Sequence, residues 1–160
     1  MFMIGDMVMH PGHGICRIMG NKVDRAAGGE FYMLKPERSL EGNGLIMVLV
    51  GQADVAGIRR LISLDQVDEV LKIVESAPQP IQFDNNGNTE IRSRIKKGDI
   101  KSIAGLLRDL VKNDSEGFPR DTDTLVKNAK EKIVLELSYI SDMPQSRTDK
   151  KITSLLKRNR

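Results

Sequence analysis

The sequence has no tryptophan, one cysteine, two histidines and an aromatic content of only 4%. A single cysteine excludes an internal disulfide, and one cysteine with two histidines cannot complete a four-ligand zinc site without carboxylates. No apolar run approaches the roughly 18–20 residues of a membrane span, and Asp6 and His10 interrupt the opening residues, where a signal peptide would be continuously apolar. We therefore expect a cytoplasmic protein with no membrane segment, no structural metal and no cofactor.

Charge is distributed unevenly along the chain. The 160 residues include 39% hydrophobic residues and have a mean hydropathy of −0.32, which is typical of a globular protein. Residues 1–76 hold 8 basic and 10 acidic side chains, whereas residues 77–160 hold 17 and 12. Because a basic surplus confined to one half points to a polyanionic partner, the second half is the candidate for nucleic-acid contact.

The first part of the chain alternates between short β-rich runs and glycine-containing breaks. The runs are Phe2–His10, Ile15–Val23, Phe31–Lys35 and Leu45–Val50. The breaks at 11–14, 26–29 and 41–44 contain glycines, which supply positive φ angles in tight turns. Four or five short strands at this spacing predict a small antiparallel sheet or barrel.

The second part predicts helices. Ser63-Leu64-Asp65-Gln66 has the form of a capping box ahead of apolar residues at helical spacing, which predicts a helix over 63–76. Ala77-Pro78-Gln79-Pro80 ends that helix and marks a domain boundary, because proline lacks an amide donor. Further helices are predicted over 89–97, 99–112, 122–142 and 147–158. The expected fold class is α+β, with a β-barrel or antiparallel sheet followed by an all-α bundle.

Local signals mark two of these helix starts and one loop. Asp99 is a candidate N-cap for the helix over 99–112. Ser146-Arg147-Thr148-Asp149 is close to a capping box ahead of the last helix. The polar stretch at 84–88 predicts a loop.

Motifs for catalysis and ligand binding are scarce. His10, His13 and Cys16 recur at intervals of three, and a structural hairpin turn explains them better than a metal site, which would need further ligands. Gly42-Asn43-Gly44 lacks the lysine and the following helix of a phosphate-binding loop. No Gly-x-Ser-x-Gly elbow is present. We expect neither an enzyme nor a small-molecule substrate.

A basic stripe is the strongest functional signal. In the helix predicted over 99–112, Lys101, Arg108 and Lys112 fall within about 40° of one another, opposite an apolar face. Further cations lie before and after this helix: Arg92, Arg94, Lys96, Lys97, Lys127, Lys130 and Lys132. A solvated charged face is the alternative for any one helix, but the set as a whole favours contact with phosphates regardless of base sequence.

Phe83 stands in a polar, proline-flanked stretch beside the basic cluster. Its ring can pack on the helices or wedge into a DNA minor groove, and the sequence leaves both readings open. No zinc finger and no aromatic RNA-recognition signature accompanies the cations.

Five elements in order carry a family resemblance. They are Gly-Asp and Pro-x-His-Gly within residues 2–15, Phe31-Tyr32-Met33-Leu34, the strand Leu45–Val50, Gly57-Ile58-Arg59, and Gly98-Asp99 followed by Ala-Gly-Leu-Leu-Arg-Asp-Leu at 104–110. In this order and separation the chain resembles the CarD-like (CdnL) bacterial transcription regulators, up to about Leu137.

The resemblance implies a Tudor-like domain over 1–60 that docks on the RNA polymerase β subunit, a helix and proline-containing linker over 61–80, and a helical domain over 81–160. The helical domain is expected to contact promoter DNA near the upstream edge of the bubble and to stabilise the open complex, with weak sequence specificity. The expected DNA contacts are Phe83, Arg92, Arg94, Lys97, Lys101, Arg108 and Lys112. The expected polymerase contacts are Lys22, Arg25, Arg38 and Met47.

Two departures from the family pattern bear on these roles. The family often has a tryptophan and closely spaced arginines at the start of the helical domain, where this chain has Phe-Asp-Asn-Asn-Gly-Asn at 83–88. Met47 stands near a position that often carries arginine in the polymerase-binding strand. The alternative function is therefore an interaction module whose helical half binds a second protein rather than DNA.

Overall fold

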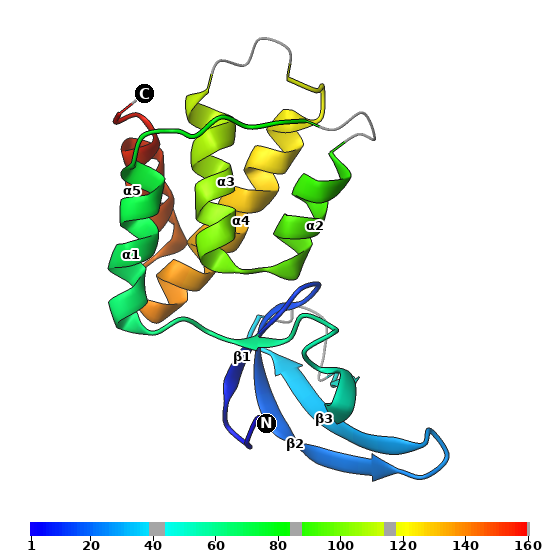
Figure 1. The fold of residues 1–160 in the computed structure, drawn as a ribbon. Coiled ribbons are helices and arrows are strands. Elements are labelled where there is room, and N and C mark those ends of the chain that lie inside the picture. Colours follow the sequence, from blue (N-terminus) through cyan, green and yellow to red (C-terminus); the bar gives the residue numbers. More distant parts are fainter. Residues whose placement is uncertain (39–43, 84–87, 114–117, 160) are drawn as a thin grey trace. The chain divides into compact units, whose positions relative to one another are not determined.

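The computed structural model of the chain describes residues 1–38, 44–83, 88–113 and 118–159. It forms two compact units, Met1–Leu61 and Ile62–Arg160 (Figure 1). The first unit is a sheet and the second is helical, so the predicted α+β fold class is confirmed. Residues 84–87 of the predicted loop and residues 42 and 43 of the glycine motif lie outside the described ranges.

The first unit is a five-stranded antiparallel sheet in the order β4-β3-β2-β1-β5. Its strands are β1 (Met7–His10), β2 (Gly14–Asp24), β3 (Gly29–Pro36), β4 (Ile46–Leu49) and β5 (Arg59–Arg60), with a 3-10 turn at Val50–Gln52. The first four lie in or around the four predicted runs. β5 has only two residues, and the sequence around it has no run of alternating apolar and polar residues that predicts a strand.

A small core sits under this sheet. It contains the buried side chains Val8, Cys16, Ile18, Tyr32, Leu34, Val48, Ala53 and Ile58. Cys16 and Ile18 lie two residues apart on one face of β2, as the period of a half-buried strand requires. The backbone N–H of Phe2 donates to the hydroxyl of Tyr32 at 3.0 Å, so the largest ring in this core has a partner for its polar end.

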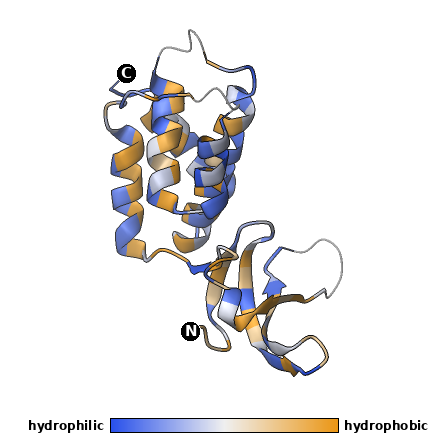
Figure 2. Ribbon diagram, turned by 45° about the vertical axis from the view of Figure 1, so that its right-hand side comes forward, coloured by the Kyte–Doolittle hydropathy of each residue, from blue (hydrophilic) through white to orange (hydrophobic). Residues whose placement is uncertain are grey.

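The second unit has five helices around one core. They are α1 (Leu64–Glu75), α2 (Thr89–Lys97), α3 (Ile100–Lys112), α4 (Thr122–Ile140) and α5 (Gln145–Leu156). The hydropathy colouring in Figure 2 shows apolar and polar residues alternating around these helices. The apolar stripe of α4 is fully used, since Leu125, Ala129, Ile133 and Leu137 are all buried. No described helix combines the length and apolar character needed to cross a bilayer.

Helix α1 packs into this helical core. Val67, Val70 and Val74 are buried there, and Gln66 accepts a hydrogen bond from the backbone N–H of Ser63 at 3.0 Å, as the predicted capping box requires. Helix α1 therefore belongs to the helical unit, and the chain divides into its two units between residues 61 and 62.

The predicted start of the last helix is wrong. α5 begins at Gln145, and its N-cap is Pro144 rather than Ser146. The carbonyl of Pro144 accepts from the backbone N–H groups of Arg147 and Thr148 at 3.1 and 3.2 Å. A proline suits a helix start because it lacks the N–H that the first turn cannot satisfy, so Ser146 falls inside the helix.

Candidate nucleic-acid and polymerase interfaces

The predicted basic cluster lies where α2 meets α3. Gly98 ends α2 in the left-handed conformation (φ 74°), which glycine adopts without steric cost. Asp99 then caps α3, since its carboxylate accepts from the backbone N–H of Ser102 at 3.2 Å. These two residues turn the chain sharply, which brings the cations of α2 close to the first turn of α3.

Three of the cations in this cluster already have polar partners. Arg92 forms an ion pair with Asp121, and Lys101 forms one with Glu69. The hydrogen bond from Lys101, with its charge, lowers the pKa of Glu69. Arg94 donates from Nε to Oγ of Ser102 at 3.2 Å.

Lys96 and Lys97 are different. Both are exposed on the last turn of α2, and neither forms an ion pair within the described ranges. Arg92 and Lys101 also remain partly exposed, at 56% and 41% of their side chains. Exposed ion pairs of this kind contribute about 0–1 kcal/mol, so a phosphate can replace the carboxylate at little cost. The name "α2 basic face" below refers to Arg92, Lys96 and Lys97.

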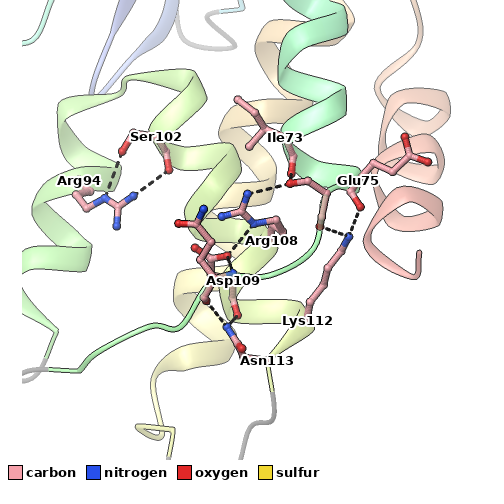
Figure 3. A network of polar contacts seen from close by, with 10 residues as sticks. Ile73, Glu75, Arg94, Ser102, Arg108, Asp109, Lys112 and Asn113 are labelled. Carbon is pink, nitrogen blue, oxygen red and sulfur yellow. Dashed lines mark hydrogen bonds and ion pairs between the residues drawn. The ribbon is translucent and has the colours of Figure 1, made fainter. Parts of the chain in front are cut away.

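Arg108 and Lys112 do not belong to an exposed stripe, which corrects the prediction made from the helical spacing. They are only 8% and 7% exposed. Arg108 donates to the carboxylate of Asp109 at 2.7 Å and to the hydroxyl of Ser76 at 2.9 Å. Figure 3 shows these two cations of α3 directed at the end of α1. The cause is that α1 covers this side of α3, so both cations hold elements of the fold together.

Phe83 packs against the helical core. Its ring meets that of Phe118 edge to face, with 4.7 Å between centroids. The ring is only partly buried, so one part remains accessible. The structure thus provides the predicted packing contact and leaves an accessible edge beside the start of α2.

The predicted polymerase contacts are exposed on the first unit. Lys22 lies on β2, Arg25 in the turn between β2 and β3, and Arg38 after β3. Met47 lies on β4, which is an edge strand, and is 42% exposed. Leu45 beside it is 48% exposed. An edge strand with exposed apolar side chains offers both backbone hydrogen bonds and apolar area to a partner.

The glycine-aspartate motif near the start of the chain has a structural role that the sequence reading missed. Asp6 accepts from the backbone N–H of Met3 at 2.9 Å and pairs with Arg60 at 2.9 Å. The backbone hydrogen bond, with Arg60, lowers the pKa of Asp6. Arg60 also lies over the ring of Phe2, with 5.6 Å to its centroid. Asp6 therefore ties the N-terminal segment to β5.

The turn with His10, His13 and Cys16 is built as a hairpin. Nδ1 of His10 accepts from the backbone N–H groups of Gly12 and His13 at 3.0 and 3.2 Å, so this nitrogen is engaged by the backbone. Cys16 is buried in the sheet, and burial raises the pKa of its thiol to about 11. Within the described ranges, no group of three or more histidine, cysteine or carboxylate side chains is arranged to hold a metal.

Comparisons with known families agree with this two-part architecture. Residues 2–62 match the CarD-like/TRCF RID domain, and residues 69–153 match the CarD C-terminal domain. The chain belongs to the CarD family. The resemblance predicted from the sequence is thereby confirmed, and the CarD assignment indicates an RNA polymerase-interacting transcription factor. CarD-like proteins are non-enzymatic. A comparison with curated proteins finds no match.

Proposed function

We propose that this CarD-like chain docks on the β subunit of RNA polymerase through residues 1–60 and contacts the backbone of promoter DNA through its helical part, residues 81–160, with 61–80 connecting them. Contact near the upstream edge of the bubble would stabilise the open complex without catalysis, in the cytoplasm. The observation that carries the DNA part is the α2 basic face, whose cations stay exposed while Arg108 and Lys112 are buried.

The chemistry of the α2 basic face suits phosphates rather than bases. Lysine ammonium groups on one helix turn neutralise backbone charge but carry no sequence information. Phe83 is the aromatic group that precedes this face along the chain, and its accessible edge is the part that would meet the unpaired bases at the bubble edge. Binding of this kind is weakly specific and falls as salt rises.

The polymerase part rests on β4. As an edge strand it has one row of backbone groups facing away from β3, and Met47 and Leu45 add exposed apolar area. The cations Lys22, Arg25 and Arg38 would supply ionic contacts around it and speed encounter. Two modest contacts joined in one chain give a higher combined affinity than either alone.

The effect on transcription then follows from linkage. A bound regulator shifts the equilibrium between closed and open promoter complexes only by the difference in its affinity for the two. DNA at the bubble edge differs between these states, so contacts made there provide such a difference.

The experiment measures open-complex lifetime on one promoter with the full chain and the Lys96→Gln/Lys97→Gln variant. The variant should shorten the lifetime and reduce its salt dependence, because two phosphate contacts are lost. Lys72→Gln/Lys127→Gln removes the same charge from exposed positions elsewhere on the helical unit and should have no such effect. If all three proteins give one lifetime while polymerase binding is intact, the α2 basic face does not contact the promoter and this proposal fails.

Docking is measured separately, as binding of the full chain to a β-subunit lobe fragment. Met47→Glu should weaken it, because a carboxylate on an exposed edge strand opposes strand pairing and apolar contact. Unchanged binding would remove β4 from the interface.

A further inference from the structure

Helix α5 carries a second, more strongly charged face. The exposed cations on this helix and in the two residues that follow it are Arg147, Lys150, Lys151, Lys157 and Arg158, called the α5 basic face below. At about 100° per residue the three within the helix fall within about 100° of one another around its axis. The buried side chains Thr148, Ile152, Leu155 and Leu156 lie on the other side, packed in the helical core.

The surplus of basic over acidic side chains in residues 77–160 lies entirely in residues 145–160, the segment that contains α5. Residues 77–144 contain 11 basic and 11 acidic side chains, whereas residues 145–160 contain 6 basic and 1 acidic. The α2 basic face is thus embedded in a neutral stretch of sequence. The field that would attract a polyanion from a distance originates mainly at α5.

Only one of the five cations of the α5 basic face is neutralised by a carboxylate within the described residues. The single acid of α5, Asp149, faces α4 and pairs with Lys130 at 3.1 Å. Arg158 pairs with Glu75 at 2.9 Å. The other four cations of this face form no ion pair within the described residues, in contrast to Arg92 on α2 and Lys101 on α3.

Stability of the helix does not account for this pattern. Arg147 lies in the first turn of α5, where a positive charge opposes the helix dipole, and Lys151 stands four residues later as a like charge. A surface that served solubility alone would mix both signs, as Lys127 and Glu131 do on α4. Local charges that work against the helix are typical of a binding site.

The side chains of the α5 basic face indicate which class of partner it binds. Residues 145–159 contain no aromatic side chain, and none of their large apolar side chains is exposed. Single-stranded nucleic acid is bound by stacking on aromatic rings, and protein interfaces have an apolar or aromatic centre with few lysines. A row of cations along α5, continued past its end by Lys157 and Arg158, suits the backbone of a duplex.

The α5 basic face is also distinct from the α2 basic face. α5 packs against α1, α4 and α3, and α2 packs against α3 and α4, so the two helices lie on opposite sides of the α3–α4 pair (Figure 1). We propose that the α5 basic face is a second, independent binding surface for the phosphate backbone of duplex DNA. It adds a site to the proposed function without depending on the α2 basic face.

The test uses the full chain, a short mixed-sequence DNA duplex and a titration of salt. The variant Arg147→Gln/Lys150→Gln/Lys151→Gln should lose about tenfold or more in affinity at low salt, and the slope of log affinity against log salt should fall by about 2 to 3, since each phosphate contact contributes about 0.9. The substituted side chains are exposed, so circular dichroism should show an unchanged helical unit.

A matched control removes the same charge from the other unit. Arg17→Gln/Lys35→Gln/Arg60→Gln changes three exposed cations and should leave duplex binding close to that of the parent chain. Equal losses of duplex affinity in both triple variants would mean that only net charge matters, which overturns the proposal. An absence of duplex binding by the parent chain would also overturn it. A loss of polymerase binding alone in the α5 variant would overturn it as well and would identify an acidic protein as the partner.

The Lys96→Gln/Lys97→Gln variant separates this proposal from the previous one. If it shortens open-complex lifetime while the α5 variant binds the duplex normally, the α2 proposal stands and the α5 proposal fails. If the α5 variant loses duplex binding and the α2 variant keeps its open-complex lifetime, the reverse holds.

Discussion

The ammonium group of Lys112 donates to the backbone carbonyl oxygens of Glu75 and Ser76 at 2.6 and 2.9 Å. These carbonyls belong to the end of α1, where no further backbone N–H is available to the helix and the dipole favours a positive charge. A cation predicted to bind DNA therefore closes the end of a helix. Its burial makes this contact stronger than a surface ion pair.

Lys112→Met should lower the free energy of unfolding of the helical unit by about 1–3 kcal/mol, because two carbonyls lose a charged donor. Chemical denaturation followed by circular dichroism measures this. Lys97→Met makes the same substitution at an exposed position and should leave the free energy of unfolding nearly unchanged. A Lys112 variant that is fully stable but binds DNA poorly would contradict the structural role.

Glu136 should matter for stability as much as any apolar core residue. It is fully buried, and its carboxylate accepts from the backbone N–H of Ile62 at 3.0 Å, which fixes the first residues of the helical unit on α4. Glu136→Ala should cost about 1–3 kcal/mol, since a buried donor loses its acceptor. Glu136→Gln keeps an oxygen acceptor and should cost less. Equal losses in denaturation experiments would mean that the negative charge of the carboxylate, and neither side-chain volume nor an oxygen acceptor, is decisive.

The hairpin turn should weaken in acid. Burial, and then the neighbouring charge of His13, lower the pKa of His10 below 6.5. The unfolded chain therefore takes up a proton at higher pH than the folded chain does. The contribution of His10 is complete above pH 6.5 and is lost as pH falls through its folded pKa, when Nδ1 can no longer accept from Gly12 and His13.

Amide hydrogen exchange of Gly12 and His13 in the full chain measures this directly. Protection should fall below pH 6.5 after correction for the intrinsic exchange rate. His10→Asn retains an acceptor that does not titrate, so its protection should be independent of pH in this range. A parent chain with pH-independent protection would show that the turn does not depend on the neutral imidazole.

Alanine variants of Phe83 and Phe118 distinguish a packing role of Phe83 from a role in DNA contact. Either alanine substitution removes the edge-to-face pair and should cost about 1–3 kcal/mol of stability, less than for fully buried rings. In the proposed function only Phe83→Ala also shortens the lifetime of the open complex. Equal lifetimes for the two variants, measured where both are folded, would leave Phe83 with a packing role alone.

Local signals predicted the fold well. The capping box at Ser63 and the glycine at 98 depend on residues only a few positions away, so sequence reveals them. Arg108 and Lys112 could not be assigned this way, because their burial depends on Ser76 and Glu75, more than 30 positions earlier in the chain. The α5 basic face was within reach of the sequence, since a charge count in shorter segments isolates residues 145–160.

The contacts at the end of α1 have a consequence for the order of folding. Arg158 donates to the carboxylate of Glu75 at 2.9 Å, and Asn159 donates to its backbone carbonyl at 3.1 Å, across sequence separations of 83 and 84 residues. The sheet unit closes all its pairings within residues 1–61 and can fold while the ribosome is still extending the chain. The helical unit cannot close α1 against Arg158 and Asn159 until these two residues have left the ribosome, so contacts of this sequence separation form late.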